Sequence, residues 1–198
     1  GSNFNVAVLS AVMEKSYSEI IELLEPSVER RMIESISDPY DSIGTKQYRF
    51  SHDKMQNAAY SMLSEEKRKW IHYSIGKTYS SSLGYAAQDR NVYDIVNQFN
   101  RCTSYFDTEK ERLNLVEMNM QAGKKAKLSS SFDQALSYFN IVIHTIESNK
   151  QDWDNQIVFE VYLESGEAAY LKSDFVSSVM FYESALKYAD TNLQKAKV

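Results

Sequence analysis

Apolar residues recur at steps of three and four along most of this chain, which is the period of an amphipathic α-helix. The first two such stretches run from Phe4 to Met13 and from Tyr17 to Met32, so we predict two short helices at the start. Pro26 lies within the second stretch. Because proline has no backbone N–H to donate inside a helix, we expect the second helix to break there.

After Met32 the hydrophobic period changes. Residues 38–46 are rich in Asp, Pro, Ser and Gly, and Tyr48 and Phe50 then alternate with polar neighbours. Alternation beyond a polar loop predicts a β-hairpin with a long connection, the only strand signal that we find. Two helices followed by a hairpin are the order expected of the last part of a winged-helix unit, which we assign to residues 1–63.

Helical patterns fill the rest of the chain. Ser64, with acidic residues at positions 65 and 66, is typical of a helix start, and we expect Gly84 to end that helix. We assign residues 64–108 to linking helices and residues 109–198 to longer helices that pair as hairpins. The predicted helices are 52–63, 64–83, 92–102, 109–128, 131–148, 154–171 and 174–190.

Two segments of the second half align without a gap. AGKKAKLSSSFDQALSYFNIVI, from residue 122, aligns with SGEAAYLKSDFVSSVMFYESAL, from residue 165, at a constant offset of 43 residues. In a helical hairpin a small residue lets the second helix approach closely, and an aromatic residue fills the groove beside it. The matched positions are Gly123, Ala126, Phe132, Ala135 and Phe139 in the first segment and Gly166, Ala169, Phe175, Ser178 and Tyr182 in the second.

This order of small and aromatic positions resembles the tetratricopeptide repeat, whose usual period is about 34 residues. The resemblance implies an α-solenoid of stacked helical hairpins. We expect the extra residues, at 147–155 (ESNKQDWDN), to lengthen the helices or their connection, with Trp153 as a packing anchor. Because two hairpins cannot cover both outer faces, either preceding helices cap the array or further repeats follow Val198, and the absence of an obvious polar cap favours truncation.

Composition supports a mainly helical, cytoplasmic protein. The 198 residues include only six Gly and two Pro, so the chain has few of the turn-forming residues that an all-β fold needs. Cys102 is the only cysteine and no Asn-x-Ser/Thr acceptor occurs, so nothing indicates secretion. No apolar run approaches the roughly 20 residues that cross a bilayer, so we expect no membrane insertion. Gly1 and Ser2 resemble the remnant of a cleaved tag, which suggests a piece of a larger protein.

The charge balance bears on possible partners. A net charge of -5 argues against nucleic-acid binding by the chain as a whole, since phosphate contacts need a basic face, although a local basic patch stays open. Lys124, Lys125 and Lys127 form a small basic cluster, which we interpret as a solvated helix face rather than an anion site.

No catalytic constellation stands out. The stretch from Ile75 to Thr78 (IGKT) has the ending of a phosphate-binding loop, but the earlier glycine is replaced by Ile71 and the pattern is helical, so we reject that reading. His52, His72 and His144 lie far apart and lack metal-site spacing. We therefore expect no enzyme active site, metal or cofactor in this chain.

The stretch YRFSHDKMQNAAYSMLSEEKRKWIHYSIGKTY, residues 48–80, resembles the segment that links the ATPase region to helical repeats in signal-transduction ATPases of the STAND class of the AAA-like superfamily. VYDIVNQFNR and LVEMNMQAGKKAKLSSSFDQALSYF, further on, are similar to multidomain proteins that join a serine/threonine kinase-like domain, an ATPase, helical repeats, a GAF domain and a histidine kinase. The resemblance covers residues 3–198.

The resemblance also implies a role for one histidine. In related signalling ATPases a winged-helix histidine contacts the β-phosphate of the bound nucleotide, and His52, with Asp53 beside it, matches that position in FSHD. The alternative is that His52 only caps its helix. The phosphate-binding loop and Mg-binding acids are absent from this sequence, so ATP or ADP is expected only in a parent protein.

These observations predict a non-catalytic regulatory segment of a signalling ATPase-kinase. Its helical repeats would bind a protein or small-molecule signal and couple it to a nucleotide switch in neighbouring domains. A DNA-binding winged-helix regulator and a free-standing repeat scaffold are the alternatives.

Overall fold

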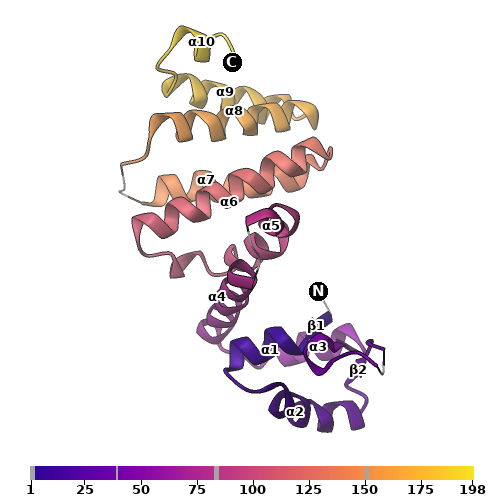
Figure 1. The fold of residues 1–198 in the computed structure, drawn as a ribbon. Helices are drawn as coiled ribbons and strands as arrows, with labels where there is room; N and C mark the ends of the chain where they lie inside the picture. The colour runs from indigo at the N-terminus through magenta and orange to yellow at the C-terminus, as the bar shows by residue number, and fades with distance from the viewer. Residues whose placement is uncertain (1–2, 39, 83–84, 150–151) are drawn as a thin grey trace. The chain divides into compact units, whose positions relative to one another are not determined.

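The computed structural model describes residues 3–38, 40–82, 85–149 and 152–198. It is mainly helical with one small sheet, and it divides into two compact units, residues 1–88 and 89–198 (Figure 1). The division falls inside the segment that we assign to linking helices, whose boundaries at 63 and 108 stay predictions. Within the described residues no helix is both long enough and apolar enough to cross a membrane.

The first unit holds a three-stranded antiparallel sheet with strand order β1-β3-β2. The central strand β3 places Tyr48 opposite Phe4 of β1 and Phe50 opposite Ile33 of β2. The elements of this unit are β1 (Asn3–Asn5), α1 (Val6–Met13), α2 (Tyr17–Glu29), β2 (Ile33–Ser35), the 3-10 turn Ile43–Thr45, β3 (Gln47–Phe50), α3 (Asp53–Ser61) and α4 (Glu65–Ser82).

Strand β1 corrects the prediction that the first helix starts at Phe4 and that the hairpin is the only strand region. The Asn5 side chain accepts a hydrogen bond from the Val8 N–H at 2.7 Å, which starts α1 at Val6. Phe4 stacks on Tyr48 with ring centroids 6.0 Å apart. This cross-strand aromatic contact joins residues that are distant in the sequence, so local periodicity did not reveal it.

The predicted break at Pro26 is also wrong, because α2 continues through it to Glu29. Pro26 lies near the C-terminal end of the helix, and the Arg30 N–H still donates to its carbonyl at 3.3 Å. The fixed φ of proline is itself helical, and the one carbonyl that loses its donor belongs to Glu22, an exposed residue that water can reach. A capping box between Ser16 and Glu19 fixes the start of the helix.

The core of the first unit is small. Val6, Ile20, Ile33 and Tyr48 are buried, one from each of α1, α2, β2 and β3. Helices α1 and α2 therefore share one apolar cluster with the sheet, which explains why strands of three or four residues are held in place.

The second unit follows the predicted helices closely. Helices α6, α7 and α8 match to within one residue, whereas α5 starts earlier than Val92, α9 ends earlier than residue 190, and α10 was not expected. Gly84, the predicted end of the preceding helix, lies outside the described residues. The elements are α5 (Tyr85–Phe99), whose first residues belong to the first unit, the 3-10 turn Thr103–Tyr105, α6 (Glu109–Leu128), α7 (Phe132–Ser148), α8 (Asn155–Leu171), α9 (Phe175–Lys187) and α10 (Asn192–Lys195).

Helices α6 to α9 pack in chain order, each against the next (Figure 1). Their shared core joins residues such as Val116 of α6, Val142 of α7 and Val161 of α8. Trp153, in the connection between α7 and α8, packs against this core, so the prediction that it is a packing anchor is confirmed. The α7–α8 connection therefore contributes to the packing of the helix pairs.

Candidate functional site

The two aligned segments make the same close contact. A Cβ atom added at Gly123 would lie 2.3 Å from the Phe139 ring, and one added at Gly166 would lie 2.6 Å from the Tyr182 ring. No described glycine has a positive φ, so these glycines are needed for space and not for backbone conformation. The small and aromatic positions of the repeat therefore mark where α7 lies against α6 and where α9 lies against α8.

The other repeat positions divide into buried and exposed ones. Ala126, Ala135 and Ala169 are buried, and so is Ser178, whose hydroxyl donates to the Gly166 carbonyl at 2.9 Å. Phe132 is half-buried, whereas its equivalent Phe175 is 58% exposed. The two hairpins thus share the contact between their own helices and differ at the start of the second helix.

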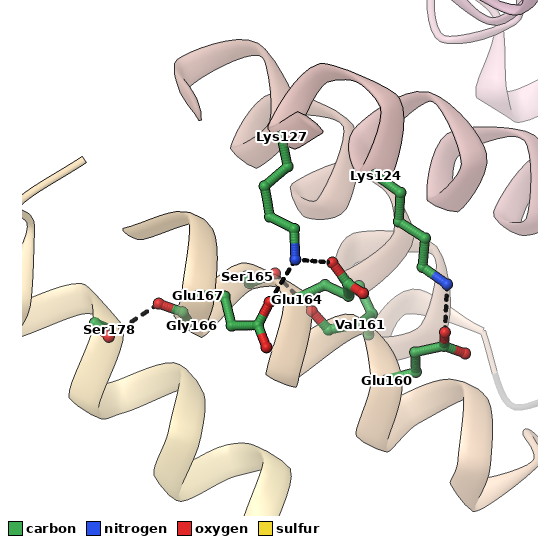
Figure 2. A network of polar contacts seen from close by, with 9 residues as sticks. All are labelled: Lys124, Lys127, Glu160, Val161, Glu164, Ser165, Gly166, Glu167 and Ser178. Carbon is green, nitrogen blue, oxygen red and sulfur yellow. Dashed lines mark hydrogen bonds and ion pairs between the residues drawn. The ribbon is translucent and has the colours of Figure 1, made fainter. Parts of the chain in front are cut away.

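The ion pairs between α6 and α8 overturn the interpretation of the lysine cluster as a solvated face. Lys124 pairs with Glu160, and Lys127 pairs with both Glu164 and Glu167 (Figure 2). The three glutamates recur at steps of four and three residues on α8, so they form one row opposite the lysines. Sequence reasoning missed these carboxylates, although that spacing was the available signal.

Lys127 is the centre of this row. Only 15% of its side chain and 17% of that of Glu164 are exposed, and Lys127 Nζ lies 2.5 Å from Glu164 Oε2. This contact is a close ion pair between opposite charges. Burial alone would lower the pKa of Lys127, but the two carboxylates outweigh it and raise that pKa. The charge therefore persists in a largely dry contact between the hairpins.

The third lysine of the cluster, Lys125, has a different contact. Its ammonium lies 5.1 Å from the centre of the Tyr93 ring of α5, and Tyr93 stacks on Tyr138 of α7. The Tyr138 hydroxyl donates to Asn97 Oδ1 at 3.0 Å. Lys125 therefore stabilises the packing of α5, and the three lysines do not form a common anion site.

A groove lies beside the ion pairs, between α6 and α8, with a volume of about 360 Å³. Its apolar surface comes from Val116, Met120 and Ile157, and its polar edge includes Glu117, Gln121 and the Lys124–Glu160 pair. Val116 and Met120 are buried, whereas Glu117 and Gln121 are exposed. An apolar floor with a polar, solvent-accessible edge suits the binding of a ligand side chain.

His52 and Asp53 lie elsewhere, in the first unit. His52 is the N-cap residue of α3, but its side chain makes no capping hydrogen bond, which does not support the alternative that it serves only as a cap. Asp53 is the first residue of the helix, and both residues are exposed. The predicted contact with nucleotide is not tested by these positions.

The other candidate groups have structural surroundings. Ile75 to Thr78 lie inside α4, and the Thr78 hydroxyl donates to the Ser74 carbonyl at 2.9 Å, so the rejected phosphate-binding loop is a helix. Burial raises the pKa of the Cys102 thiol to about 11, which disfavours the reactive thiolate. The His72 ring nitrogen Nε2 forms a hydrogen bond with the Tyr60 hydroxyl, with 3.0 Å between the two atoms. In the described part of the chain, no group of three potential metal ligands comes together.

Comparison with known proteins gives one distant relative. No family model matches the chain, and no solved structure matches it. The chain is 29% identical, over 168 residues, to hybrid signal transduction histidine kinase G of Dictyostelium discoideum. This chain is therefore similar to a signalling protein. The match covers 72% of this chain but only 5% of that kinase, and it fits a regulatory segment of signal transduction.

The repeated glycine contact can be tested by substitution. We expect Gly123→Ala to lower the free energy of unfolding by about 1–3 kcal/mol, because the new methyl group overlaps the Phe139 ring. Phe139→Leu should destabilise the chain by itself but relieve part of the overlap. In a urea double-mutant cycle, the two changes together should cost less than their sum. Strict additivity would contradict the contact.

The ion-pair row predicts unequal effects of lysine removal. Lys127→Met should destabilise the chain by about 1–3 kcal/mol, because Glu164 loses its counter-charge in a mostly buried position. This loss lies between the values typical of breaking an exposed ion pair and of breaking a buried one. Lys172→Met, which removes the exposed pair with Asp133, is the matched control and should cause little change. Equal shifts in the urea midpoint would show that Lys127 has no special role.

Proposed function

We propose that this chain is a non-catalytic regulatory segment of a larger signalling protein. Its helices α6 to α9 bind a partner in the groove between α6 and α8 and pass that event to neighbouring domains. The groove carries the proposal, because its apolar floor and polar edge lie on a scaffold fixed by repeated helix contacts. The distant similarity to a signal transduction histidine kinase supports a place in signalling.

The polar groups of the groove favour binding over catalysis. Lys124 and Glu160 neutralise each other, and Glu117 and Gln121 are exposed on the edge. A general acid or base needs a carboxyl or ammonium group aimed at a substrate in an enclosed site. The arrangement in this groove is better suited to orienting a ligand than to transferring a proton.

The finer architecture is also part of the proposal. In the first unit the element order β1-α1-α2-β2-β3 supports a winged-helix-like unit. In the second unit the equivalent contacts at Gly123 and Gly166 support tetratricopeptide-like hairpins of an α-solenoid with a longer period. The parent protein would be a cytoplasmic STAND-type ATPase joined to serine/threonine and histidine kinase domains, with ATP or ADP bound outside this chain.

Of the alternatives, a DNA-binding winged helix has little support. The hairpin itself carries two basic residues, Lys46 and Arg49, and Arg49 donates from Nε to Glu34 Oε1 at 2.6 Å, which reduces its availability for phosphate. The overall charge of -5 opposes DNA as well. A free-standing scaffold would use the same groove without coupling it to kinase output.

The role of the groove can be tested in the full-length protein that contains this chain. Gln121→Trp would fill the mouth of the groove from an exposed position and leave the buried core unchanged. We expect a several-fold change in autophosphorylation rate. Asn140→Trp, an exposed change on α7 away from the groove, is the control and should behave like the wild type. If the two variants gave the same rate, the groove would not be the regulatory site.

The proposed contact of His52 with nucleotide needs its own test. A histidine at a helix start beside backbone N–H groups suits a phosphate oxygen. In the full-length protein, we expect His52→Ala to raise the Kd for ADP, measured by calorimetry, about tenfold. This change corresponds to a loss of about 1.4 kcal/mol of binding free energy. His144→Ala, on α7, removes a histidine of the second unit and should have no effect. Unchanged ADP affinity in the His52 variant would end this assignment.

A further inference from the structure

The charges around the groove are unequal. The charged residues that line the groove are two carboxylates, from Glu117 and Glu160, and one ammonium group, from Lys124. The ammonium group is already engaged, since Lys124 pairs with Glu160 (Figure 2). The lining that a ligand meets therefore has a net negative charge, which comes from Glu117.

Glu117 is the carboxylate best placed for a ligand. It lines the groove, it is exposed, and it forms no ion pair with any described residue. Val116 and Met120, next to it on α6, provide the apolar floor. A methionine side chain is flexible and polarisable, so it adapts to aliphatic ligand groups of different shape. One short stretch of α6 thus offers an apolar contact and a free negative charge together.

From this juxtaposition we infer the chemistry of the ligand. The groove takes a peptide segment of a partner protein in which a large aliphatic side chain enters the floor and a nearby lysine or arginine pairs with Glu117. The inference rests on the proposed binding function of the groove and adds the ligand class to it. An acidic or phosphorylated segment would meet the uncompensated carboxylate of Glu117, and a like-charge contact of this kind selects against wrong partners.

Two synthetic probes distinguish these ligands. One is a fluorescein-labelled peptide of 12 residues that alternates leucine and lysine, and the other has glutamate in place of every lysine. Both are titrated with the 198-residue chain, and binding is followed by fluorescence anisotropy. We expect the leucine–lysine peptide to bind at least about tenfold more tightly than its acidic counterpart. Equal affinity, tighter binding of the acidic peptide, or no binding of either would overturn the ligand class.

Matched variants separate a specific contact from general attraction to an acidic protein. Glu117→Lys should weaken the leucine–lysine peptide about tenfold, and Glu117→Gln should weaken it less. Glu183→Lys makes the same charge change at an exposed site on α9 and should leave affinity within about twofold. Both positions are exposed, and circular dichroism checks that each variant keeps its helical content. An equal loss in the Glu183 variant would show nonspecific attraction and overturn the inference.

The Gln121→Trp variant distinguishes the inference from the proposed function. It should abolish binding of the leucine–lysine peptide, and retained binding would place the peptide outside the groove and overturn the inference. If peptide binding behaves as expected but the full-length protein signals normally with Gln121→Trp, the proposed function fails and the ligand class stands. If only the acidic peptide binds, and Gln121→Trp blocks it, the ligand class fails and the groove remains a binding site.

Discussion

The close approach of paired helices at two glycines is the constraint on which the second unit depends. Gly123 and Gly166 lie directly under the Phe139 and Tyr182 rings, where a side chain of any size would push the helices apart. Because each ring fills the space left by the missing side chain, the two helices of a hairpin have a fixed separation. The hairpins can then stack as preformed units.

The ion-pair row and the groove both follow from that stacking. Lys124 and Lys127 reach the carboxylates of α8 only because the two hairpins present α6 and α8 on a common surface. Removing the buried charge of Lys127 from water is costly, so the pair adds less to stability than its short distance suggests. The ion pair instead helps to align α6 with α8, and this alignment determines which residues surround Met120 on the groove floor.

Equivalent apolar residues of the two hairpins of the second unit differ in exposure. In the second hairpin, Val176 and Val179 of α9 are 75% and 56% exposed, although Leu136, the equivalent of Val179, packs against the shared core. The sequence repeat therefore conceals a difference in surroundings. Equivalent residues have the same neighbours within a hairpin, and different neighbours on its outer face.

The sequence by itself determined α6, α7 and α8 to within one residue, and it determined the contacts inside each hairpin. Helical periodicity depends on neighbouring residues, and the repeated small and aromatic positions of each pair lie only 16 residues apart, as Gly123 and Phe139 show. Only the tertiary structure decided the partners of Lys127, the strand at Phe4 and the groove at Met120. Each of these features joins residues that are more than 35 positions apart. Each such residue has many compatible partners in the sequence, and the packing of whole helices and strands decides which of them it contacts.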